Sequence, residues 1–202
     1  MKKLLSLLFL CACAYATPPR EKWRALLGGA SNGAMSPTLR VAKKPLYQES
    51  GGTLVSKDKA ANYMNRLEAK LEDTLRKPGI QISRIGTDVR VVMVRSSLIY
   101  TDSPEISKMG DDLLGDLVDV LKEYNSTWIE ITGYTDSMAN QENAVALSRD
   151  MASRVAVYFA KHGIKPIRMF VNGRGSANPI ADQSDIGRLM NLRIEVRLSI
   201  VN

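Results

Sequence analysis

Residues 128–136 read WIEITGYTD, and this stretch decides the fold. Its first six residues are rich in β-branched and aromatic side chains, which predicts a strand from Trp128 to Gly133. A polar turn follows, and helical spacing of apolar residues then predicts a long helix from Asn140 to Lys161, which Gly163 ends. Strand, turn and helix in this order are typical of a domain in which helices cover a sheet.

The flanking sequence adds further elements of the same kind. The cleanest strand is Arg193–Ile200, where alternation places Ile194, Val196 and Leu198 inward and Arg193, Glu195, Arg197 and Ser199 outward. The other predicted elements are strands at 80–85, 89–94 and 168–172, and a short helix or loop at 185–191. A further helix is predicted to about Tyr124, with Ser103 at its cap position. Together they predict an α+β fold, with a mixed β-sheet and helices packed on one face.

The chain divides into four segments. Residues 17–55 are basic and rich in proline and glycine, which predicts a flexible linker. Residues 56–78 predict an amphipathic helix that Ser56 can cap and that Pro78-Gly79 ends. Residues 79–202 then form the folded domain.

The first 16 residues predict a secretory signal peptide. Lys2 and Lys3 precede an apolar run at residues 4–10, and small residues follow. Two cleavage sites stay open. Ala14-Tyr15-Ala16 suits ordinary cleavage, whereas Leu10-Cys11-Ala12-Cys13 resembles a lipobox that would place a lipid on Cys13. We favour the lipid, which predicts a protein anchored on the periplasmic side of the outer membrane; without it the protein would be soluble in the periplasm.

Composition argues against an enzyme. Both cysteines lie in the signal segment and His162 is the only histidine, so neither a thiol nucleophile nor a cysteine or histidine metal site is predicted. No cofactor is indicated. The net charge of +7 suits an anionic partner, but the basic residues are scattered, so no nucleic-acid partner is predicted.

Several short motifs occur in an order that, together with the predicted elements, can be compared with known domains. They are Gly133-Tyr134-Thr135-Asp136, Leu147-Ser148, Gly187-Arg188, Asn191 and Arg193. With their secondary structure, they resemble the OmpA-like peptidoglycan-binding domain over roughly residues 79–201. The resemblance implies an OmpA C-terminal-like sandwich that binds the diaminopimelate of the peptidoglycan stem peptide without catalysis.

The resemblance also implies the site. In the family an aspartate meets the ammonium group of diaminopimelate, and an arginine fifteen residues later holds its carboxylate. A zwitterionic ligand needs one fixed charge of each sign. Asp136 stands at the aspartate position, and Thr135, Arg188, Asn191 and Arg193 at the other expected contacts.

The sequence departs from the family at the arginine, because Met151 occupies that position and Leu192 replaces a second arginine. Arg154 is a poor replacement, since it lies almost one helical turn further along. Two interpretations stay open. The protein anchors to peptidoglycan, with an affinity that loss of a charge-assisted pair would lower about tenfold to a hundredfold. Alternatively it is a scaffold subunit of an envelope-spanning complex, as its similarity in layout to short lipoproteins of Dot/Icm type IV secretion systems suggests.

Overall fold

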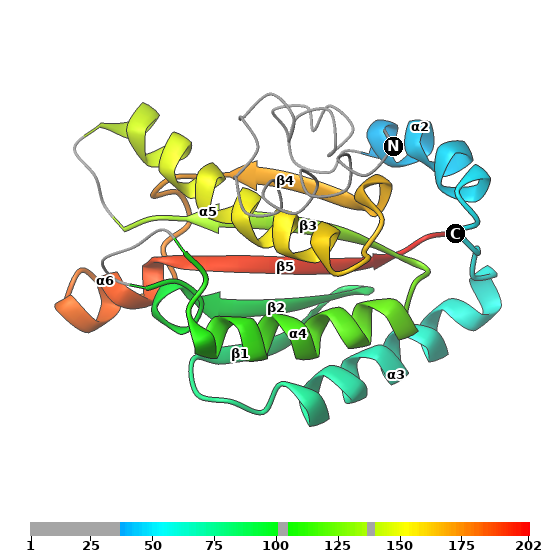
Figure 1. The fold of residues 1–202 in the computed structure, drawn as a ribbon, viewed down its shortest axis with the longest axis horizontal. Helices are drawn as coiled ribbons and strands as arrows, with labels where there is room; N and C mark the ends of the chain where they lie inside the picture. The colour runs from blue at the N-terminus through cyan, green and yellow to red at the C-terminus, as the bar shows by residue number, and fades with distance from the viewer. Residues whose placement is uncertain (1–36, 101–104, 137–139) are drawn as a thin grey trace, which may run out of the picture.

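The computed structural model describes residues 37–100, 105–136 and 140–202. A five-stranded sheet in the order β1-β2-β5-β3-β4 forms its centre (Figure 1). The strands are β1 (Ile80–Ile85), β2 (Asp88–Val94), β3 (Thr127–Tyr134), β4 (Met169–Gly173) and β5 (Arg193–Ile200). Only β3 and β4 pair in parallel, and all other neighbours are antiparallel, so the sheet is mixed as predicted.

The helices surround this sheet in the chain order α2, α3, α4, α5 and α6 (Figure 1). Their bounds are α2 (Pro37–Glu49), α3 (Lys57–Thr74), α4 (Lys108–Glu123), α5 (Gln141–Lys161) and α6 (Asp185–Asn191). Two 3-10 turns, at Arg95–Ser97 and Pro166–Arg168, follow β2 and precede β4.

One face of the sheet forms the main hydrophobic core. Side chains alternate across a strand, so Ile129 and Ile131 of β3 point to the same side as Val196 of β5. Apolar residues of α3, α4 and α5, such as Leu117 and Phe159, meet them there. Each such side chain contributes about 1.5–3 kcal/mol when fully buried. This core holds the sheet rigid beneath the three helices.

Helix α2 departs from the predicted arrangement in two ways. The sequence predicted an irregular linker here, but residues 37–49 form a helix whose Tyr47 is buried against Trp128. Trp128 and Phe170 alternate with core residues of their strands, so α2 covers the opposite face of the sheet. Lys43 of α2 donates a hydrogen bond to the Met169 carbonyl (3.1 Å) and lies over the Phe170 ring. Helices therefore pack on both faces, not on one.

Helix α4 begins later than predicted. Ser107 caps it by accepting a hydrogen bond from the Gly110 amide (2.9 Å), whereas Ser103 was expected to do so. Ser103 itself lies outside the described residues. At the C-terminal end of α4, the Arg168 side chain donates hydrogen bonds to the carbonyls of Leu121 and Tyr124. Burial lowers the pKa of Arg168 to about 10.

Three of the four outward residues of β5 are buried, and only Arg197 is partly exposed. Arg193 and Ser199 are each 1% exposed, and Glu195 is 9% exposed. The face of the sheet away from the main core therefore carries buried charged side chains.

The signal segment 1–16, the lipidation candidate Cys13 and most of the linker lie outside the described residues. Across residues 37–100, 105–136 and 140–202, none of the helices combines the length and apolarity needed to cross a bilayer.

Candidate functional site

The predicted site residues gather at one edge of the sheet. Strands β2, β3 and β4 all end there, and β5 begins there beside α6 (Figure 1). The pairing places Val94, Arg193 and Tyr134 in one row across β2, β5 and β3. Residues that follow β3 and β4 therefore emerge side by side.

Two glycines allow α5 to pack directly on these strand ends. A Cβ atom at Gly133 would lie 1.9 Å from the Ser148 carbonyl oxygen of α5. A Cβ atom at Gly173 would lie 2.5 Å from the amide nitrogen of Arg149 and from the Val145 carbonyl oxygen. Backbone atoms cannot yield as flexible side chains do, so any larger residue would push α5 off the sheet.

Ser148 fixes the turn that follows β4. Its hydroxyl accepts a hydrogen bond from the Gly175 amide (2.9 Å) and donates to the Val145 carbonyl (2.9 Å). Gly175 has φ +57°, a conformation that favours glycine. This contact explains the Leu147-Ser148 motif, because the serine ties the helix to the turn.

The same turn is joined to the end of β3. The Arg174 amide donates to the Gly133 carbonyl (3.0 Å), and the Thr135 amide donates to the Gly175 carbonyl (2.8 Å). These bonds continue the β3–β4 ladder beyond its last paired residues, Gly133 and Gly173. The residues after both strands are thus held by backbone bonds.

Thr135 and Asp136 have unused polar groups. The Thr135 hydroxyl is buried and has no hydrogen-bond partner among the described residues, although the residue is only 2% exposed. Asp136 is partly exposed, and its carboxylate makes no hydrogen bond or ion pair with residues 37–100, 105–136 or 140–202. An unsatisfied buried hydroxyl costs about 1–3 kcal/mol, so a ligand that bonds it recovers that energy.

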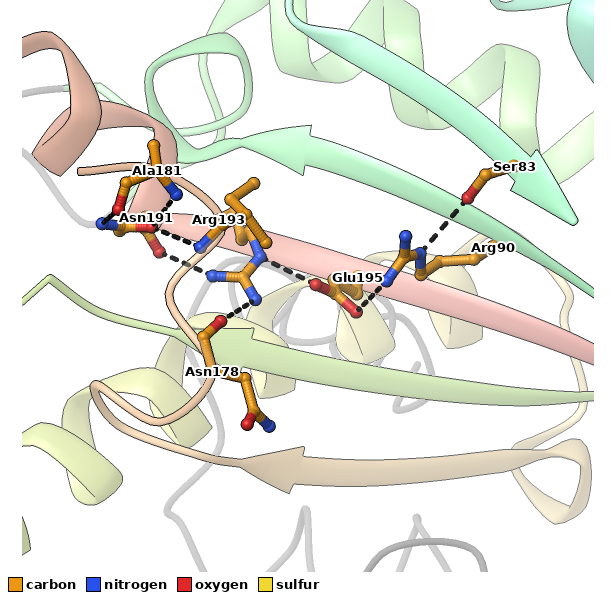
Figure 2. Close-up of polar contacts among 8 residues, drawn as sticks. Ser83, Arg90, Asn178, Ala181, Asn191, Arg193 and Glu195 are labelled. Carbon is orange, nitrogen blue, oxygen red and sulfur yellow. Dashed lines mark hydrogen bonds and ion pairs between the residues drawn. The ribbon is translucent and has the colours of Figure 1, made fainter. Parts of the chain in front are cut away.

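Asn191 is used within the chain. It is 1% exposed, and its side-chain oxygen accepts hydrogen bonds from the amides of Ile180 (2.8 Å) and Ala181 (3.1 Å). Its amide nitrogen donates back to the Ala181 carbonyl (3.1 Å). Asn191 therefore shapes the loop before α6 (Figure 2).

Arg193 is also used within the chain (Figure 2). It donates to the Glu195 carboxylate (2.7 Å), to the Asn191 carbonyl (3.3 Å) and to the Asn178 carbonyl (2.9 Å). Its guanidinium lies 3.8 Å from the centre of the Tyr134 ring. Arg90 approaches the other oxygen of Glu195 at 3.8 Å, which extends the buried charge row.

Arg188 lies apart from this row. It is exposed on α6, and its Nε donates to the Gln183 carbonyl (3.1 Å). The structure thus brings all five predicted residues to one end of the molecule. Among these five, the side chains of Thr135 and Asp136 make no hydrogen bond within the described part of the chain, and Arg188 uses only its Nε.

Met151 is buried and supplies no charge to the site. It is 3% exposed and belongs to the main hydrophobic core. Arg154, the poor replacement, pairs with Asp150 at 2.7 Å. Neither position on α5 therefore supplies an unpaired positive charge.

Tyr134 lies between charged groups at this edge. Burial raises the pKa of Tyr134, Glu195 raises it further, and Arg193 and Arg174 lower it. The pairing of Gly133 with Gly173 places the next residues, Tyr134 and Arg174, beside one another, and Arg174 was not among the predicted site residues. The signal was available, because Arg174 stands between the two glycines that follow the fourth strand.

Within the described part of the chain, no group of three or more histidine, cysteine or acidic side chains could hold a metal ion. The site instead combines one free carboxylate, one free hydroxyl and nearby arginines. Such groups bind polar, charged ligands through directional hydrogen bonds.

Comparison with known proteins agrees with this geometry. The sequence model of the OmpA family matches residues 100–189, which include β3, α5, β4 and the turns at the site. This chain contains an OmpA-like domain.

The relatives of this OmpA-like domain include envelope proteins. Probable lipoprotein YiaD of Escherichia coli is 34% identical over 138 residues, which are 68% of this chain and 63% of YiaD. The chain thus spans somewhat less than two thirds of that relative. Peptidoglycan-binding protein ArfA of Mycobacterium tuberculosis is 33% identical over 86 residues, covering 42% of this chain and 26% of ArfA.

Solved structures share the fold of the OmpA-like domain. A MotB-like protein of Desulfovibrio vulgaris superposes with a TM-score of 0.62 at 21% identity, covering 71% of this chain and 95% of that one. The cell wall anchor of the type VI secretion system of Pseudomonas aeruginosa gives a TM-score of 0.58 at 23% identity, covering 68% and 99%. These similarities confirm the predicted fold class, with helix α2 as the departure described above.

Proposed function

We propose that this chain is a non-catalytic protein of the bacterial cell envelope that binds the peptidoglycan stem peptide at the ends of β3 and β4. One observation carries the proposal: Asp136 has a partly exposed carboxylate without a partner among the described residues, and the preceding residue, Thr135, has an unsatisfied buried hydroxyl. A free carboxylate suits the ammonium group of diaminopimelate, and charge-assisted bonds of this kind are among the stronger ones in proteins.

The names of the relatives support this proposal. ArfA is named as a peptidoglycan-binding protein, and the Pseudomonas aeruginosa structure is that of a cell wall anchor. The net charge of +7 also suits a polymer that carries carboxylates.

Export and lipid anchoring belong to the same proposal. The signal-like residues 1–16 and Cys13 would attach the chain to the periplasmic side of the outer membrane, and YiaD is named as a lipoprotein. Helix α2, the first described element, contacts the starts of β3 and β4 through Trp128 and Met169. Helix α2 thus lies toward the end of the sheet opposite the site (Figure 1).

Sedimentation with purified sacculi tests the binding proposal. We expect the full chain in mild detergent to pellet with sacculi, and Asp136→Asn to lower the bound fraction about tenfold or more. Asp119→Asn is the matched control, because its side chain is 81% exposed on α4. Equal pelleting of wild type and Asp136→Asn would contradict the proposed site.

The alternative function is a scaffold subunit of an envelope-spanning secretion complex with a degenerate site. Met151 favours it, because a buried methionine cannot replace the arginine that the family uses. This alternative predicts that the folded wild-type chain stays in the supernatant while it copurifies with envelope subunits from cells.

A further inference from the structure

Diaminopimelate is a zwitterion, so Asp136 alone cannot hold both of its charges. The position of the family's arginine is filled by Met151, which is buried in the core. Resting on the proposed function, we propose that Arg174 binds the carboxylate of the diaminopimelate group. The cation would then come from the turn after β4 instead of from α5.

The backbone places Arg174 beside the end of β3. Its amide donates to the Gly133 carbonyl (3.0 Å), and the next residue, Gly175, accepts from the Thr135 amide (2.8 Å). Neighbouring strands lie about 4.8 Å apart, so the Cα atom of Arg174 is roughly one strand spacing from Tyr134. Asp136 follows Tyr134 by two residues, so Arg174 and Asp136 come from the ends of two neighbouring strands.

Arg174 and Asp136 are both unpaired among the described residues. Arg174 is exposed, and its guanidinium has no hydrogen bond or ion pair within the described ranges. The two groups do not form a salt bridge with each other either. Two unpaired charges of opposite sign on adjacent strand ends match a ligand that carries an ammonium and a carboxylate.

The other arginines at this edge fit less well. Arg193 is buried, and its donors are bonded to Glu195, Asn191 and Asn178. Arg95 follows β2, which β5 separates from β3, so it is roughly two strand spacings away, about 10 Å. Arg188 stands on α6, and its Nε donates to the carbonyl of Gln183, which precedes that helix.

The turn is also suitably rigid. Ser148 holds Gly175 through the 2.9 Å hydrogen bond, so the backbone next to Arg174 is fixed to α5. A guanidinium on a fixed backbone binds a carboxylate as a two-pronged fork with less loss of entropy than a group on a mobile loop. The side chain remains free to close on the ligand.

A pair of stem peptides tests this assignment. One peptide carries diaminopimelate with a free side-chain carboxylate, and the other carries the same group as a carboxamide, which removes the negative charge. By calorimetry, we expect the full chain to bind the free acid roughly 10- to 100-fold more tightly than the amide. Arg174→Gln should abolish this preference and bind both peptides with the weaker affinity, whereas Arg174→Lys should keep part of it.

Arg95→Gln is the control, because it removes a positive charge from the same end of the molecule. It should keep the preference for the free acid within about twofold. If Arg174→Gln keeps the full preference, or if the control loses it, the assignment of Arg174 is overturned while the proposed function stands. If the wild-type chain binds neither peptide, the proposed function fails and the assignment fails with it.

Discussion

Two regions at the same end of the sheet use their polar groups in opposite ways. In the region where α6 ends and β5 begins, Asn191 and Arg193 are buried and bonded to their own chain. In the turns after β3 and β4, Asp136 and Arg174 are unpaired within the described residues. The polar residues of this edge thus divide into those that bond their own chain and shape the site, and those whose side chains stay available to bind a ligand.

The largest expected effect follows from breaking the first region. Arg193→Met should lower the free energy of unfolding by about 3–5 kcal/mol, because it leaves the Glu195 carboxylate buried without its 2.7 Å partner. Arg174→Gln should change it by no more than about 0.5 kcal/mol, since the side chain is exposed. Chemical denaturation of both variants measures the contrast, and similar losses would show that the two regions do not differ.

A smaller loss of stability is expected at Asn191. Asn191→Ala should lower the free energy of unfolding by about 2–3 kcal/mol, because the amides of Ile180 and Ala181 lose their acceptor. Met190→Ala, at the exposed neighbouring position on α6, should be nearly neutral. A neutral Asn191→Ala would indicate that water replaces the side chain, and the residue would then not shape the loop.

Ser148 fixes the turn after β4 to α5, and its removal should affect both stability and binding. Ser148→Ala should cost about 1–2 kcal/mol in unfolding free energy, because the buried Gly175 amide loses its acceptor. It should also weaken stem-peptide binding, since the turn that carries Arg174 is no longer fixed. Ser153→Ala is the matched control, because the Ser153 hydroxyl bonds only the Arg149 carbonyl of its own helix.

The smallest effect concerns pH. Burial raises the pKa of Tyr134 above its ordinary value of about 10, so the folded state keeps the phenol proton when the unfolded state loses it. The resulting stability is present below pH of about 10 and declines as pH rises above it. Tyr134→Phe should make the decline of the melting temperature in this range shallower. An unchanged slope would contradict the shift.

Much of the fold could be predicted from the sequence, because its elements have strong periodicity. The alternation of Arg193–Ile200 and the helical spacing after Asn140 both correspond to observed elements. The helix at 37–49 was missed because Pro45 and flanking glycines suggested a linker, whereas burial of Tyr47 against Trp128 stabilises it. Such a contact joins residues far apart in the chain, and local patterns do not contain it.

The site could be predicted only in part. Thr135 and Asp136 were identified from the resemblance to the OmpA-like motif, and both side chains lack partners among the residues that the structure describes. Asn191 and Arg193 were expected to touch the ligand, but burial and internal bonds give them a positioning role. Arg174 was overlooked because its proximity to Asp136 depends on the parallel pairing of β3 and β4.

The most direct test of the account is a titration of the isotope-labelled chain with the diaminopimelate stem peptide, followed by backbone amide NMR. We expect the largest shifts at residues 133–136 and 173–176, and we expect Asp136→Asn and Arg174→Gln each to reduce them. Shifts that are confined to α6 or to the far end of the sheet near α2, or no shifts at millimolar peptide, would contradict it.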